Sequence, residues 1–351
     1  MSASVNKKKS PAILFGLGIA VMVVVTLIAN LRSGLVRELR FPLNNGVAYV
    51  FTCESNLVGV CHDGKVYVWD WDNLSAQPGI VDAQSDQAVL LESGRVVSVR
   101  ESNARKIVVA ELDDGKMHKE IPIAGEGKQV RLAVNRSGST IVVMLARTNN
   151  ETKVSDQEVA LADCNAGLVR PIANLAEAAG DRIMGMAISD DGGLIVLAGE
   201  KNGQGYVVLV NKEQKRVVWA KHLPDLQKVR NAVFSTDSKV IYVRGTDSAV
   251  QILSIVDGSV IKKLLPLKDN RSTAGDQNVQ TLTVSSDGHF MAASISSGVY
   301  VWDCTMQKVI FRKGPGHKLV SGLAFSPDSK YLATSDTRQG GTIKIWRVPK
   351  H

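Results

Sequence analysis

The sequence is poor in the residues that carry catalysis and metal binding. It has 4 cysteines and 6 histidines in 351 residues, and aromatic residues make up 5%. The histidines lack the short, regular spacing of metal ligands. There is no HExxH motif, no GxSxG elbow and no phosphate-binding glycine loop followed by a helix. Asp190 and Asp191 precede two glycines that offer no side-chain oxygen to calcium, so they indicate a tight turn. The sequence therefore predicts no metal, no cofactor and no catalytic residue.

Positive charge is not concentrated in one stretch of the repeats either. The formal net charge is +8, but Lys7, Lys8, Lys9 and Arg32 stand in the first 33 residues, where there is no acid. Few aromatic residues alternate with lysine or arginine, so the sequence argues against nucleic-acid binding. The hydrophobic content of 44% is sufficient for a large core and argues against disorder.

The four cysteines do not define a disulfide framework. Cys53 and Cys61 flank one expected turn, and the sequence leaves open whether they pair in an oxidising compartment or are buried thiols. Cys164 and Cys304 stand at equivalent positions of distant repeats. We therefore expect them to lie far apart and not to pair.

One long apolar run is present, at residues 12–29. It carries no charge, and at about 1.5 Å per helical residue it spans roughly 27 Å, close to the thickness of a hydrocarbon core. It predicts a transmembrane helix after a basic tail at 1–11 and before a short linker at 30–34. A cleaved signal peptide is the alternative, although Leu27 before Ala29 fits its cleavage site poorly.

The basic residues on the two sides of this run are nearly balanced, so the positive-inside rule favours a cytoplasmic N-terminus only weakly. A short basic tail before a first apolar segment is typical of a signal anchor. We therefore expect the rest of the chain on the extracytoplasmic, periplasmic side, with the cytoplasmic side as the alternative.

Seven repeats follow the apolar run. In each, an apolar strand ends in a small acidic or glycine-containing turn, and the turns recur every 46 residues or so, a period typical of propeller blades. Four strand signals alternate with turn signals in a repeat, and the second strand is almost entirely apolar, as in blades packed face to face. The turn residues are Glu54, Ser93, Ser137, Asp191, Asp237, Asp287 and Asp328.

Three segments carry a resemblance to a known family: HDGKVYVWD in the first repeat, SGVYVWD in the sixth, and GPGH with LAFSPDSKYLATSD and GTIKIW in the seventh. In these segments the chain resembles the WD-repeat propeller family. The resemblance implies a buried structural hydrogen-bond set in the seventh blade, formed by His317, Ser335 or its neighbour Thr334, Asp336 and Trp346. The fold class expected is an all-β, seven-bladed propeller of four-stranded blades at 35–351, preceded by the transmembrane helix.

The seventh repeat supplies only three strands before the chain ends at His351. Residues 35–43 read like the fourth strands of other repeats, so we predict that they complete the last blade and close the ring. Because successive strands alternate in direction, this segment starts at one face of the propeller, which we call the bottom. The expected transmembrane helix precedes the segment, so we expect the bottom face to lie against the bilayer. Arg32, Arg37, Arg40, Arg347 and Lys350 are expected near it, either against anionic head groups or as ordinary solvated charge.

The longest connections fall on the opposite face, called the top, at residues 148–157, 173–182 and 268–277. Rigid scaffolds commonly bind through such loops, although polar loops also vary in length without a function. We expect the protein to be a non-catalytic interaction scaffold, or an accessory or assembly subunit of a membrane complex, that binds protein partners at the top face. The alternative is an extracytoplasmic enzyme or small-ligand sensor that uses the central channel, where Arg131 and Arg230 are the visible candidates.

Overall fold

The computed structural model describes most of the chain after the apolar run. The described residues are 34–40, 49–52, 57–62, 64–82, 88–90, 95–101, 105–111, 117–123, 129–135, 137–148, 155–163, 167–172, 180–245, 250–264, 281–295, 298–306, 308–313, 320–336 and 342–349. Almost all of them lie in strands or in the turns that connect strands.

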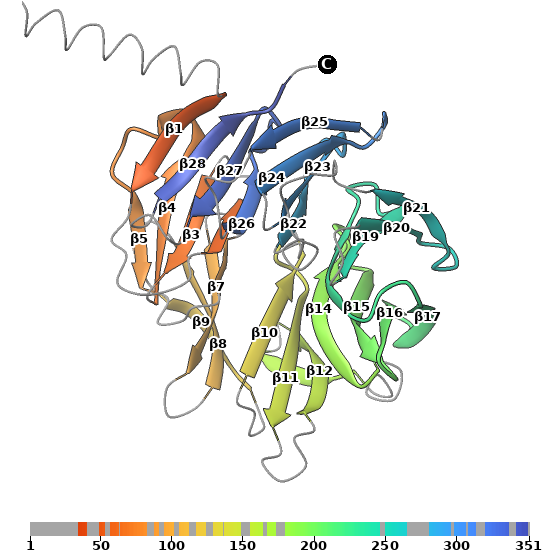
Figure 1. Cartoon of the computed structure of the whole chain (residues 1–351). Helices are drawn as coiled ribbons and strands as arrows, with labels where there is room; N and C mark the ends of the chain where they lie inside the picture. Colours follow the sequence, from red (N-terminus) through yellow and green to blue (C-terminus); the bar gives the residue numbers. More distant parts are fainter. Residues whose placement is uncertain are drawn as a thin grey trace, which may run out of the picture.

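The strands form seven four-stranded antiparallel sheets, which we call blades 1 to 7 (Figure 1). Six blades contain four strands that follow one another in the chain, and the seventh combines strands from both ends.
Blades 1 to 3 comprise β2 Tyr49–Thr52, β3 Leu57–His62, β4 Lys65–Asp70 and β5 Gly79–Asp82; β6 Ala88–Leu90, β7 Arg95–Glu101, β8 Arg105–Glu111 and β9 Met117–Pro122; and β10 Gln129–Val134, β11 Ile141–Thr148, β12 Ser155–Asp163 and β13 Leu168–Pro171.
Blades 4 to 6 comprise β14 Arg182–Ile188, β15 Leu194–Lys201, β16 Gln204–Asn211 and β17 Arg216–Leu223; β18 Val229–Phe234, β19 Val240–Gly245, β20 Val250–Ser254 and β21 Val260–Leu264; and β22 Thr281–Val284, β23 Phe290–Ile295, β24 Gly298–Asp303 and β25 Lys308–Lys313.
Blade 7 comprises β26 Val320–Phe325, β27 Tyr331–Asp336, β28 Thr342–Arg347 and β1 Leu35–Arg40.

The blades are arranged in a closed ring. The first strand of each blade contacts the first strand of the next, and β26 of blade 7 contacts β2 of blade 1. These first strands therefore surround the central axis, and the fourth strands lie at the outside.

The hydrophobic core lies between the blades. One cluster, for example, joins Val142 and Met144 of blade 3 to Ile195, Leu197 and Val208 of blade 4. Further clusters join blades 2 and 3, 4 and 5, 5 and 6, 6 and 7, and 7 and 1. The second strands are mostly apolar, as expected for blades whose two faces are both covered by neighbours.

The two ends of the chain meet in blade 7. Strand β1 pairs antiparallel with β28 (Figure 1). In this ladder Leu39 lies opposite Ile343. Leu39 is only 4% exposed and belongs to the cluster shared by blades 7 and 1. The pairing covers the edge of β28 that would otherwise be open. Residues 41–43, the end of the segment expected to close the ring, lie outside the described residues.

The expected fold class needs a correction, because it placed a transmembrane helix before the propeller. No helix in the described part of the chain is long and apolar enough to cross a membrane. The helical element among those residues is the 3-10 turn η1 Trp71–Asn73, and most of the rest is β structure. Residues 12–29, together with the tail and linker expected at 1–11 and 30–34, lie outside the described residues.

The cysteine expectations are tested only in part. Cys304 is a free thiol. Cys53 and Cys164 lie outside the described residues, so the open question of a bond between Cys53 and Cys61 stays a prediction.

Candidate functional site

The turns between the first and second strands of blades 4 to 7 share one hydrogen-bonded arrangement at the bottom face. In blade 6 the Ser285 hydroxyl donates to Asp287 Oδ1 at 2.6 Å and accepts from the Phe290 amide at 2.9 Å. Asp287 Oδ1 also accepts from the His289 amide at 3.0 Å. The same serine-to-aspartate bond forms in the other three blades, in the pairs Ser189–Asp191, Ser235–Asp237 and Ser326–Asp328.

The fourth residue of each turn has a positive φ. Gly192 and Gly288 adopt it without steric cost, whereas Ser238 and Ser329 adopt it at φ 53° and 58°. The serine–aspartate bond and the left-handed residue together fix a tight turn. The turn series visible in the sequence therefore has a structural role.

The same bonds set the charge of these aspartates. The Ser189 hydroxyl and the Gly193 amide lower the pKa of the Asp191 carboxyl below its ordinary value. Burial raises the pKa of Asp287 and Asp328, but hydrogen bonds from serine and from the following residues outweigh it, and both carboxyl pKa values end up lowered. All three are ionised at neutral pH.

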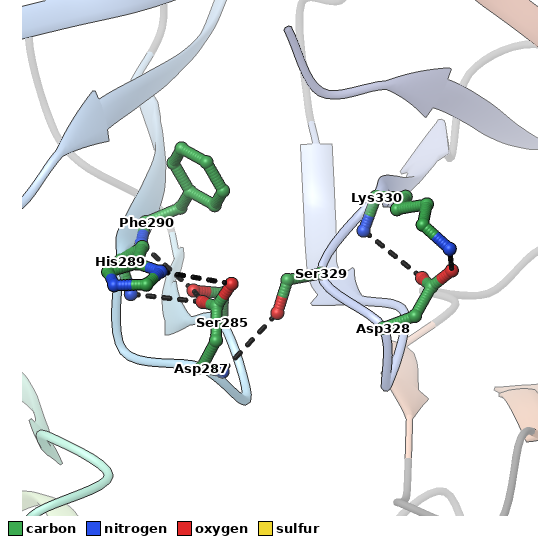
Figure 2. Close-up of polar contacts among 7 residues, drawn as sticks. All are labelled: Ser285, Asp287, His289, Phe290, Asp328, Ser329 and Lys330. Carbon is green, nitrogen blue, oxygen red and sulfur yellow. Dashed lines mark hydrogen bonds and ion pairs between the residues drawn. The ribbon is translucent and has the colours of Figure 1, made fainter. Parts of the chain in front are cut away.

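A cavity of about 470 Å³ opens between the turns of blades 6 and 7 (Figure 2). Ser329 tilts across the gap, where its hydroxyl accepts from the Asp287 amide at 3.3 Å and links the two blades.
The lining combines apolar and charged residues: Asp287, His289, Phe290, Asp328, Ser329, Lys330, Tyr331, Arg347, Val348 and Pro349.

Two of the ionisable side chains in this cavity lie beside an acid. His289 Nδ1 lies 3.3 Å from Asp287, and Lys330 Nζ lies 2.8 Å from Asp328. The Asp328 carboxylate raises the pKa of Lys330, which keeps that amine charged. Arg347 lies beside the start of the closing strand, because its amide donates to Gly34 O at 2.8 Å.

The buried hydrogen-bond set expected in blade 7 is described in part. The Trp346 indole donates to Thr334 Oγ1 at 2.9 Å, and both side chains are buried. Ser335 is also fully buried, and the backbone of Asp336 pairs with Thr342. His317 and the side chain of Asp336 lie outside the described residues, so the full set stays a prediction.

Residues 308–347 match the family described as "WD domain, G-beta repeat". This segment runs from the last strand of blade 6 through the first three strands of blade 7, and it includes the Trp346–Thr334 pair. This segment matches the WD-repeat family, and the chain as a whole folds as a β-propeller. A search of curated proteins gave no match.

Among solved structures, the propeller resembles a chain of the structure called "Crystal Structure of Mitotic Checkpoint Complex". The TM-score is 0.67, the sequence identity is 14%, and the match covers 100% of this chain and 99% of that chain. At this identity the likeness concerns the fold alone.

At the top face the structure describes the strand ends but not most of the residues in the expected binding loops. Residues 149–154, 173–179 and 265–280, which make up most of the expected binding loops 148–157, 173–182 and 268–277, lie outside the described residues. Beside the first loop, Gln157 Nε2 donates to Ile183 O at 3.0 Å, and the Ile183 amide donates to Gln157. These bonds hold blade 3 against blade 4 where the loop leaves the sheet.

The two arginines expected at the channel lie on first strands. Arg131 of β10 is exposed and donates to Met184 O of blade 4. Arg230 is exposed and stands in a β-bulge between Val229 and Asn231 of β18. The structure brings each of them to the inner ring but does not join them in one site. In the described part of the chain, no group of three or more His, Cys, Asp or Glu side chains could hold a metal.

Sequence reasoning missed one residue on this face, Arg244 of β19. It is 7% exposed, and within the described structure its Nε and Nη1 have no hydrogen-bond partner. An arginine inside the apolar run VIYVRG was the signal that could have found it.

Proposed function

We propose that this WD-repeat propeller is a non-catalytic protein-interaction scaffold whose partners bind the top face. The observation that carries the proposal is the presentation of cations there: Arg131, Arg182 and Arg230 are exposed on the first strands of three successive blades. Strand ladders and bonds between blades hold these strands in place. A rigid surface with fixed charges selects partners by complementarity and requires no reacting group.

The general behaviour of the family supports this proposal. WD-repeat propellers bind protein partners and are mostly scaffolds without catalytic activity, and the structural match comes from a multiprotein assembly. We infer that the propeller is an accessory or assembly subunit of a larger complex.

Crosslinking with mass spectrometry on native cells tests the scaffold. Three replacements of residues 149–154, 173–179 and 268–277 by short glycine–serine linkers should remove the partner crosslinks and leave the melting curve unchanged, because they spare Gln157 and the described strands. The matched control carries His289→Ala and Lys330→Ala at the bottom cavity and should retain the partners. Loss of partners in the control with retention in the linker variant would refute top-face binding.

The extracytoplasmic location expected from the sequence forms part of the same proposal. Protease added to sealed vesicles of known orientation should digest the propeller only where the extracytoplasmic side faces outward. Digestion in the opposite orientation would place the propeller in the cytoplasm.

A further inference from the structure

Arg244 lies at the top end of the apolar cluster between blades 5 and 6. In the strand ladder it is opposite Val250, which is opposite Leu264. Residues opposite one another share a face of the sheet. Val250 and Leu264 both pack in the cluster that includes Leu282 and Met291 of blade 6. The Arg244 side chain therefore enters a space whose walls are mostly apolar.

The equivalent position of blade 6 shows what the fold ordinarily places there. Ser294 stands at the same distance from its turn serine, Ser285, as Arg244 does from Ser235. The Ser294 hydroxyl donates to Val320 O of blade 7 at 3.2 Å and accepts from the Thr281 amide at 3.2 Å. A short hydroxyl is thus satisfied by backbone groups, whereas blade 5 has a long cation in its place.

Two nitrogens of the buried Arg244 guanidinium have no acceptor among the described residues. Nε and Nη1 are both buried and unpartnered among the described residues. Burial first, and then the nearby Arg230 cation, lower the pKa of Arg244 to about 10, so the group remains charged at neutral pH. A buried cation beside a second cation is costly, and an oxyanion removes that cost by pairing with both.

Two lysines near this site already form ion pairs with acidic side chains. Lys228, one residue before β18, pairs with Glu200 at 3.0 Å, and Lys263 of β21 pairs with Asp225. These pairs leave the Arg244 and Arg230 guanidinium groups as the unmatched positive charge at the top of blade 5, as far as the structure is described.

We propose that Arg244 and Arg230 receive a carboxylate from an acidic segment of a protein partner that binds the top face. The planar guanidinium of Arg244 offers two parallel N–H donors to a carboxylate, and the exposed Arg230 guides the acidic segment to it. The inference rests on the proposed scaffold function and gives the chemistry of the partner.

Binding of fluorescein-labelled hexaglutamate to the full-length protein, followed by fluorescence anisotropy, tests the site. Arg244→Gln should weaken binding by about 10- to 100-fold, the range of one charge-assisted, desolvated contact. Arg230→Gln should weaken it by a smaller factor. The matched control is Arg216→Gln, an exposed arginine at the start of the outer strand β17, which should change binding by less than about threefold. Equal losses in all three variants would indicate a diffuse basic surface and overturn the proposal, as would absence of binding to the wild-type protein.

Two further measurements distinguish other occupants. The first is binding of inorganic phosphate. If phosphate binds at low millimolar concentration, if Arg244→Gln abolishes that binding, and if the peptide does not bind, the site takes a small anion and the proposal is overturned. Asp247 is the nearest acid along the chain, so tighter peptide binding in Asp247→Asn would show that the chain fills its own site.

The melting temperature gives an independent readout. Arg244→Met and Arg244→Gln should leave it unchanged or raise it, because they remove an unpaired buried charge. A fall of several degrees in both would reveal an internal partner and overturn the proposal. If the protein fails to bind hexaglutamate but still forms partner crosslinks, this inference is wrong and the proposed scaffold function is retained.

Discussion

Truncation of Leu39 in the closing strand should open blade 7. Leu39 is 4% exposed and packs with Trp69 of blade 1 and Ile343 and Ile345 of β28. A buried leucine replaced by alanine loses its transfer free energy and leaves a cavity, at a cost of about 2–4 kcal/mol. Strand β1 belongs to blade 7 only through its pairing with β28. We therefore expect most of this cost to favour separation of β1 from β28.

Hydrogen exchange of the β28 amides measures that separation directly. A loss of about 2–4 kcal/mol corresponds to exchange that is roughly 30- to 700-fold faster at amides bonded to β1. Val36→Ala in the same strand is the matched control, because Val36 is 48% exposed and its truncation should cost less than about 0.5 kcal/mol. Equal protection of β28 in wild type and Leu39→Ala would refute the idea that the two ends of the chain hold the ring closed.

Three other perturbations follow from the described contacts. Trp346→Phe leaves the buried Thr334 hydroxyl without its indole donor and should lower the free energy of unfolding in urea by about 1–3 kcal/mol. The double variant with Thr334→Val should recover most of this loss. No recovery would contradict a specific bond between the two side chains. Because hydrogen bonds outweigh burial and lower the folded pKa of Asp328, its contribution to stability is complete above the unfolded pKa of about 4 and is lost as pH falls through the lower folded value. Asp328→Asn should therefore flatten the fall in melting temperature below that pH, and an unaltered profile would exclude this carboxyl. Gly185→Ala places a Cβ 2.8 Å from a backbone carbon of β18 and should destabilise the protein by about 1–3 kcal/mol. Gly193→Ala is the control, because its Cβ would meet only ordinary contacts. Equal melting temperatures of the two variants would argue against a close approach of β14 to β18.

The features that sequence reasoning found are those that repeat. A turn such as Ser285–Asp287 is local, so its chemistry is visible in a few adjacent residues. The pairing of residues 35–40 with β28 was also visible, because a strand with no partner must find one and the segment resembles other fourth strands.

Contacts between strands were harder to assign from the sequence. The choice between Thr334 and Ser335 depends on which face of β27 meets Trp346. In the ladder Leu332 is opposite Trp346, and alternation puts Thr334 on the same face as Leu332. Thr334, rather than its neighbour, therefore shares the face of the indole that donates to it. A one-residue difference in register reverses that assignment, and composition alone does not fix register.

The sequence could mark Arg244 as buried, but it could not show that its charge is unmatched. The pattern of β19 marks its position as buried, and a buried arginine ordinarily has an acid nearby. Whether an acid is present depends on the neighbouring blade, whose first two strands come later in the chain and contribute Leu282 and Met291 to this cluster. Only when blades 5 and 6 stand side by side does the guanidinium become an unmatched charge in an apolar wall. The repeat fixes the scaffold, and a departure from the repeat at one position, arginine where blade 6 has Ser294, indicates where that scaffold differs in what it binds.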